Sequence, residues 1–166
     1  MQFYQHRFSK IEDYLHHRPP YLLVDRVSNL QKHAIQTSKQ LQMEDPWVAG
    51  HFPGAPVFPG ALMQELVTQS AGILIAANYN PMKTYDTHDP NANQYALGVL
   101  LKVDHSRYRS FARPGDTLDV SVELLDMVYP AFRFSGAISV DSQEIMSIQF
   151  LLANIATPQL TGSASG

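Results

Sequence analysis

The sequence predicts an α+β fold in which an antiparallel β-sheet packs against one long buried helix. A continuous apolar segment with helical character spans residues 59–77, and several strand-like runs joined by short turns follow it. Consecutive strands with hairpin-length links favour antiparallel pairing, and such a sheet buries its apolar face against the helix. The chain has 166 residues, of which 45% are hydrophobic, so we expect one domain over residues 1–160 and a flexible tail at 161–166.

Composition narrows the possible functions. The formal net charge of -3 gives the whole chain no attraction to nucleic acid or to anionic membranes. Cysteine is absent, which excludes disulfides, thiolate nucleophiles and cysteine-ligated zinc. The first fourteen residues carry several charges and no long apolar stretch, so they resemble neither a secretory signal nor a membrane anchor. We therefore expect a cytoplasmic protein that neither binds nucleic acid nor inserts into a membrane.

Two extended segments are expected before the helix: a short strand or strand-like segment at residues 21–27 and a strand at 34–41. The first is rich in Leu and Val and follows two prolines, which favour an extended backbone. In the helical segment 59–77, Pro59 suits the first turn because its missing N–H has no partner there anyway. The strongly polar residues of this segment, at positions 64, 65, 68 and 69, fall within one arc of the helix. Such a helix is buried in a larger structure.

The second half of the chain predicts a long loop and then a run of strands. Residues 78–94 contain two prolines and several asparagines, which is typical of a long loop that shapes a site. Strands are expected at 95–103 and 118–124, the latter from a clear alternation of apolar and polar residues. The same alternation continues over 132–140, and 145–155 forms a final apolar strand.

His51 is the first candidate for chemistry. It stands in the run G-H-F-P-G at residues 50–54, where prolines stiffen the backbone and glycines permit close approach of a ligand. A lone histidine near a turn more often has a structural role. A stiff turn, however, holds a reactive group at a fixed geometry, which favours a catalytic role here.

Glu65 is the second candidate, because it is a carboxyl group on an otherwise uncharged helical segment. A helical glutamate is normally an exposed surface residue. Residues 59–77 contain no Lys or Arg to pair with it, which argues against a routine surface ion pair. Gln69, one turn later, is close enough to hydrogen-bond with Glu65, although support of packing is the more ordinary role for it.

The start of the helix supplies a third element. Gly60 lies where backbone N–H groups lack intrahelical partners and where the helix dipole favours negative charge. An imidazole base, a carboxylic acid and such a helix start would together suit removal of water from a 3-hydroxyacyl thioester. This chemistry needs neither a metal nor an organic cofactor.

The motifs at these positions resemble those of the bacterial 3-hydroxyacyl-acyl-carrier-protein dehydratases of the FabZ type. They are L-H-H-R-P-P-Y-L-L-V-D-R at 15–26 and G-H-F-P-G-A-P-V-F-P-G at 50–60, then Glu65 with Gln69, then R-Y-R at 107–109 and P-G-D at 114–116. The similarity extends over residues 11–155. The sister family that also isomerises the double bond has Asp at the position of Glu65, so the glutamate indicates plain dehydration.

The resemblance implies a hotdog fold, in which the strands wrap the long helix. It also implies a homodimer and leaves open a further assembly of three dimers into a hexamer. His51 of one subunit and Glu65 of the other would share each active site. The Gly60 amide would bind the thioester carbonyl, with Phe58 and Pro59 beside the substrate and Gln69 supporting Glu65. The implied partner is acyl carrier protein bearing a 3-hydroxyacyl-phosphopantetheine group.

Three departures from the family pattern concern the substrate and the carrier. The family usually has Pro where His16 stands, a shorter loop than residues 78–94, and a more basic turn than M-V-Y-P at 127–130. A specialised pathway for polyene, polyunsaturated or polyketide lipids is therefore nearly as plausible as housekeeping fatty acid synthesis.

A local excess of positive charge fits a carrier-borne substrate. Between residues 102 and 113 the chain has four cations, Lys102, Arg107, Arg109 and Arg113, against the single carboxylate of Asp104. These four cations, which we call the basic rim, would attract an acidic carrier protein. The ordinary interpretation is that they are scattered cations at a solvated strand end. Two other functions stay open: a hotdog acyl-thioesterase, and a non-catalytic subunit that binds acyl thioesters.

Overall fold

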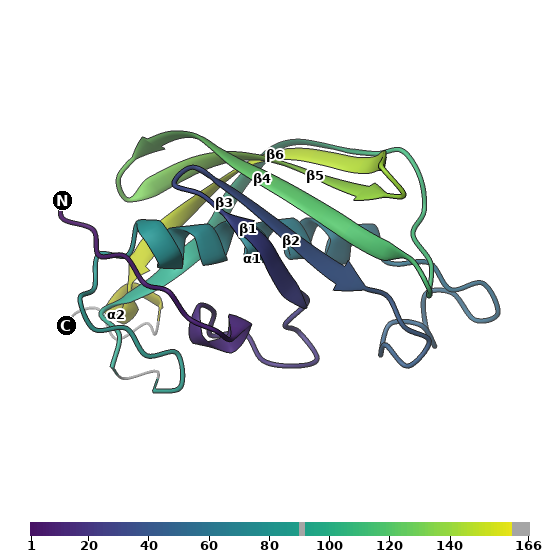
Figure 1. Cartoon of the computed structure of the whole chain (residues 1–166), viewed down its shortest axis with the longest axis horizontal. Coiled ribbons are helices and arrows are strands. Elements are labelled where there is room, and N and C mark those ends of the chain that lie inside the picture. The colour runs from purple at the N-terminus through teal and green to yellow at the C-terminus, as the bar shows by residue number, and fades with distance from the viewer. Residues whose placement is uncertain (90–91, 161–166) are drawn as a thin grey trace.

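A computed structural model describes residues 1–89 and 92–160, and within them an antiparallel sheet of six strands lies against one long helix (Figure 1). The strand order is β1-β2-β4-β5-β6-β3. The strands are β1 (Arg26–Leu30), β2 (Ala34–Gln40), β3 (Tyr95–Tyr108), β4 (Thr117–Val128), β5 (Ala131–Val140) and β6 (Gln143–Ala156). The predicted α+β architecture is confirmed. The tail expected at 161–166, and residues 90–91 of the expected loop, lie outside the described residues.

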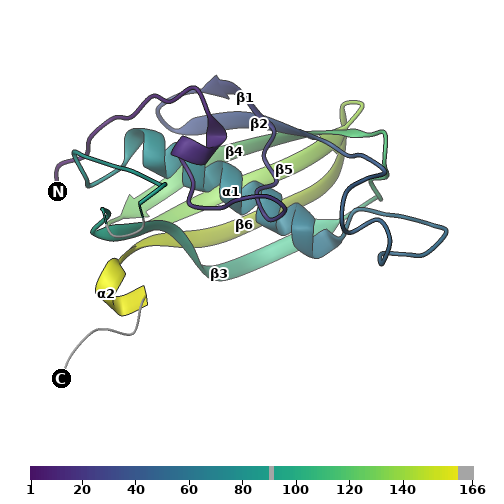
Figure 2. The ribbon, with the colours of Figure 1, turned by 90° about the horizontal axis from the view of Figure 1, so that it is seen from below.

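The central helix α1 (Gly60–Asn78) is buried over most of its length, as its apolar sequence predicts. It begins at Gly60, with Pro59 immediately before it as the N-cap residue. On one side it packs on the sheet, and on the other it is covered by the N-terminal segment, which includes the short 3₁₀ helix η1 (Ile11–Asp13) (Figure 2). A Cβ atom added to Gly136 of β5 would lie 2.4 Å from the Val67 Cγ1 atom, so this glycine allows the helix to approach the sheet.

One predicted element differs from the structure in position. The sequence pattern predicts a strand over residues 21–27, but the strand β1 starts only at Arg26. Leu23 and Val24 are buried, as their apolar character requires, yet the Leu23 N–H donates to the Gln69 side chain on α1 instead of to a neighbouring strand. The segment therefore serves as a support for the helix. The strands expected from residue 34 onward are confirmed, with ends that differ by a few residues.

The strand β3 forms one edge of the sheet and pairs only with β6 among the described strands. It is longer than predicted and reaches Tyr108. Leu101 and Tyr108 are 52% and 46% exposed on it. A short helix, α2 (Thr157–Leu160), follows β6 and was not predicted. No helix in the described ranges combines the length and the apolar character needed to cross a membrane.

Candidate active site

Glu65 projects from the polar arc of α1 and is held by two side chains of the same helix. The Gln69 Nε2 atom donates a hydrogen bond of 2.8 Å to Glu65 Oε1, and the Thr68 hydroxyl lies 3.4 Å from Oε2. Gln69 is itself fixed, because its Oε1 accepts the Leu23 N–H at 2.8 Å and its Nε2 also reaches the Tyr21 carbonyl at 2.8 Å. The carboxyl group therefore has a defined orientation in a network that joins α1 to the segment before β1.

His17 lies beside Glu65, a position that the motif at residues 15–26 contained but that sequence reasoning did not single out. Its Nε2 atom is 3.6 Å from Glu65 Oε1, and its ring stacks on Tyr21 with centroids 5.8 Å apart. Burial lowers the pKa of His17, the Glu65 carboxylate partly offsets this, and the Arg18 cation lowers it further. The His17 Nδ1 atom is buried and has no hydrogen-bond partner in the described part of the chain. An unpaired buried lone pair costs less than an unpaired buried N–H, which favours a neutral ring with its proton on Nε2, facing the carboxyl group.

A cavity of about 480 Å³ opens next to Glu65. Its walls come from α1, from the first half of β3, from the N-terminal segment and from the loop after α1. Apolar side chains, among them Leu15, Leu97 and Val99, contribute much of its lining, and Glu65, Thr68 and Gln69 lie together in its wall. The size and lining suit an acyl chain that ends in a polar reacting group beside the carboxyl.

His51 lies on the segment between β2 and α1, where one contact fixes its tautomer. The Nδ1 atom is 2.9 Å from the Val57 carbonyl oxygen. Since a carbonyl only accepts, Nδ1 carries the proton and donates it, which leaves a lone pair on Nε2. The ring also stacks on Phe52 with centroids 4.1 Å apart. This tautomer is the one that a general base needs.

The residues that lead from His51 into α1 differ in their placement. Phe58 is 2% exposed and packs edge-on against Trp47, so its side chain belongs to the core. Its backbone N–H is bonded to the Ala112 carbonyl at 2.8 Å. The Pro59 carbonyl accepts from the third and fourth helical residues, which leaves the N–H groups of Gly60 and Ala61 without an acceptor in the helix. A helix start with two such N–H groups is a chemical environment that can stabilise a negatively charged oxygen.

His51 and Glu65 are not linked directly to each other in this structure. His51 is not among the residues that line the cavity, and within the described residues no hydrogen bond or ion pair links the two side chains. Each chain thus carries a well-positioned imidazole on one segment and a well-positioned carboxyl group in a separate cavity.

Comparison with known proteins identifies the family. The model of the FabA-like domain matches residues 15–149. A 3-hydroxyacyl-[acyl-carrier-protein] dehydratase FabZ from Thioalkalivibrio sulfidiphilus is 33% identical over 141 residues, which cover 84% of this chain and 91% of the relative. The chain belongs to the FabZ-type dehydratase family. FabZ proteins from Anaeromyxobacter dehalogenans and Coxiella burnetii are 32% and 33% identical, again over most of both chains.

Solved structures place this FabZ-type chain among hotdog folds. The dehydratase heterocomplex ApeI:P from Xenorhabdus doucetiae has a chain that aligns with a TM-score of 0.75 at 19% identity, covering 96% of this chain and all of that one. Thioesterase superfamily member 2 from Mus musculus aligns with a TM-score of 0.56 at 11% identity, covering 77% of this chain and 80% of that one. At such identities the likeness concerns the fold alone, and it confirms the hotdog fold expected from the family motifs.

The four cations predicted to meet a carrier protein are all exposed on this FabZ-type chain. Two of them are paired with carboxylates: Lys102 with Asp104 at 2.7 Å, and Arg109 with Glu144 at 2.6 Å. Arg113 lies over the Phe111 ring, 5.5 Å from its centre. The structure adds Glu144 to the carboxylates of this region, but it also adds Arg133, which pairs with Asp104, so the excess of positive charge counted from the sequence is unchanged.

Proposed function

We propose that this chain removes water from 3-hydroxyacyl thioesters carried on acyl carrier protein, giving 2-enoyl thioesters in fatty acid biosynthesis or a related lipid, polyene or polyketide pathway. Membership of the FabZ-type family supports the reaction. The observation that carries the proposal is the Glu65 carboxyl, oriented by Gln69 at the wall of a largely apolar cavity. Thioesterases share this fold at low identity, whereas dehydratases share about a third of the sequence.

In the proposed reaction His51 Nε2 takes the proton from C2 of the substrate. The electrons of that C–H bond form the C2=C3 double bond, the C3–O bond breaks, and Glu65 protonates the departing hydroxyl group to give water. The N–H of Gly60 stabilises the negative charge that develops on the thioester oxygen, with Pro59 beside the substrate and the buried Phe58 side chain packed behind it in the core. His51 ends protonated and Glu65 ionised, and solvent exchange restores both.

We propose that the active site forms between two copies of the chain, with His51 from one and Glu65 from the other. The absence of His51 from the lining of the cavity beside Glu65 supports this. The strand β3, which lies at the sheet edge among the described strands, and its exposed Leu101 and Tyr108 support it too. A dimer is the smallest assembly that would complete the site, and a trimer of dimers extends it. The cytoplasmic location expected from the sequence stays a prediction.

Mass spectrometry of 3-hydroxyacyl carrier protein incubated with the enzyme tests the reaction, because loss of one water reports dehydration directly. His51→Asn keeps a donor for the Val57 carbonyl and removes the base, and Glu65→Gln keeps the shape and removes the acid. Each should lower kcat at least about 100-fold while the far-ultraviolet circular dichroism spectrum is kept. Either variant retaining most of its activity would contradict the assignment. Release of free thiol without loss of water would identify a thioesterase, and tight binding without product would identify a binding subunit.

Mixing the two inactive variants tests the shared site. A mixed dimer has one site that lacks both groups and one intact site, so subunit exchange should restore part of the activity. If both catalytic groups of a site come from the same chain, mixing restores nothing.

Docking of the carrier protein on the basic rim gives a separate test. Arg107→Glu and Arg113→Glu should raise KM for acyl carrier protein substrates more than for N-acetylcysteamine thioesters, which lack the carrier. Lys102→Glu serves as the comparison, since this lysine already pairs with Asp104. Equal effects on both kinds of substrate would contradict docking at this rim.

A further inference from the structure

The cavity beside Glu65 runs along the helix, and two close contacts show how β3 is oriented beside it. A Cβ atom added to Gly60 would lie 3.2 Å from the Tyr108 ring, and one added to Gly98 would lie 3.2 Å from the Gly72 Cα atom. The end of β3 is therefore next to the start of α1, and the two elements run in opposite directions. Glu65 lies toward the start of the helix, so the start of β3 lies at the far end of the cavity.

Three of the side chains that line the cavity at this end form what we call the far wall: His16, Tyr85 and Asn93. Asn93 Nδ2 donates to His16 Nε2 at 2.9 Å, and the Tyr85 hydroxyl donates to the Tyr14 carbonyl at 2.8 Å. Tyr85 and Asn93 are only 8% and 5% exposed. His16 and the long loop after α1, two of the departures from the family pattern, are thus in direct contact at this wall.

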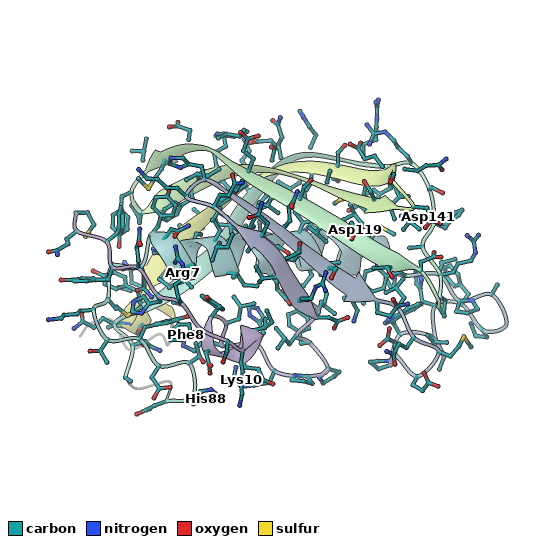
Figure 3. All side chains as sticks on the ribbon, viewed as in Figure 1. Arg7, Phe8, Lys10, His88, Asp119 and Asp141 are labelled. Atoms are coloured by element: carbon teal, nitrogen blue, oxygen red, sulfur yellow. The ribbon has the colours of Figure 1, made fainter. Side chains whose placement is uncertain are left out.

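Further contacts hold the loop in place behind the far wall. Asn93 Oδ1 accepts the Asp86 N–H at 3.2 Å, and the Thr157 hydroxyl donates to the Asn93 carbonyl at 2.8 Å. His88 lies beside the N-terminal segment (Figure 3), where its Nε2 atom is 2.9 Å from Asp13 Oδ1. Arg18 Nη2 donates to the Thr87 carbonyl at 3.0 Å. Displacing the far wall would break several of these bonds together.

We propose that the far wall sets the longest acyl chain that the enzyme accepts, an inference that rests on the proposed dehydratase function. An acyl chain that starts at Glu65 runs past the apolar side chains of Leu15 and Leu97 and then meets polar groups that are already bonded to one another. A longer chain has to break these bonds or leave its apolar end against them, and both are unfavourable. Chains that end within the apolar part meet no such penalty.

The test measures kcat/KM for 3-hydroxybutyryl, 3-hydroxyoctanoyl, 3-hydroxydodecanoyl and 3-hydroxyhexadecanoyl thioesters of acyl carrier protein. The wild-type enzyme should show a limit, beyond which kcat/KM falls at least about tenfold. His16→Ala and Asn93→Ala should raise kcat/KM at least about tenfold for the first length beyond that limit and leave the butyryl substrate nearly unchanged. Tyr85→Ala should give a larger shift because it removes the largest side chain of the wall.

Tyr85→Phe is the matched control, because it keeps the ring in place and removes only the bond to Tyr14, so the length limit should stay. His16 is exposed enough that His16→Ala leaves folding intact even if Tyr85→Ala does not, and butyryl turnover reports this for each variant. The proposal is overturned if the wild type accepts all four lengths equally, or if His16→Ala and Asn93→Ala keep the wild-type limit. Absence of turnover at every length would instead overturn the proposed function, and this inference with it.

Discussion

Replacing Gln69 by leucine tests how far stability and activity depend on one buried amide. Gln69 is 2% exposed, and its side chain makes three hydrogen bonds of 2.8 Å, to the Leu23 N–H, the Tyr21 carbonyl and Glu65 Oε1. Gln69→Leu keeps the bulk and leaves the buried Leu23 N–H without an acceptor, which costs about 1–3 kcal/mol. With the lost bond to the partly exposed Glu65 carboxyl, the free energy of unfolding should fall by about 2–4 kcal/mol.

For a chain of this length, that loss lowers the melting temperature by roughly 5–15 °C. In addition, kcat should fall about 10- to 100-fold because Glu65 loses the partner that orients it, while KM changes little. Urea denaturation and steady-state dehydration kinetics measure the two effects. Gln64→Leu is the matched control, since Gln64 lies on the same arc of α1 but outside this network. The reasoning is refuted if Gln69→Leu and Gln64→Leu unfold within about 0.5 kcal/mol of each other and have equal kcat.

Two further predictions concern packing and pH. Gly136→Ala should reduce the free energy of unfolding by about 1–3 kcal/mol, because its methyl group meets Val67 Cγ1. Val67→Ala removes that clash, so the double variant should be more stable than the sum of the two single losses predicts. Denaturant titration of the three variants measures both effects. Burial lowers the pKa of His17 in the folded chain. As the pH falls below about 6.5, this histidine therefore takes up a proton in the unfolded chain before it does so in the folded chain. The stability contributed by the neutral ring is present above that pH and is lost below it. His17→Gln should therefore reduce the fall in urea midpoint between pH 7.5 and pH 5.5, and an unchanged fall would contradict this role.

Local sequence patterns predict a helix or strand when its conformation depends mainly on its own residues and little on distant partners. The helix α1 follows from a long apolar segment with a short polar arc, and the strands after it follow from alternation and turn residues. Residues 21–27 have a strand-like composition, but the backbone at Leu23 bonds to Gln69, which lies 46 positions later in the chain. A pattern within a short window contains no information about such a distant partner.

The candidate site also has features that the local sequence predicts and contacts that it does not. The stiff turn around His51 could be recognised from the sequence, and so could the Glu65 carboxyl on a helical segment without Lys or Arg, because both are local features. The proximity of His17 to Glu65 could not, since it depends on how the N-terminal segment crosses α1. The same holds for the contact of His16 with Asn93, which joins positions 77 residues apart.

The edge strand β3 has a consequence for the handling of this protein. A long strand that has no neighbouring strand on its outer side among the described residues is a template on which other chains aggregate. If a second copy covers this edge in the proposed dimer, the association that completes catalysis also keeps the protein in solution. Substitutions on the outer side of β3 would then cause precipitation rather than release stable, inactive monomers, and natural selection for solubility would preserve the same surface as selection for turnover.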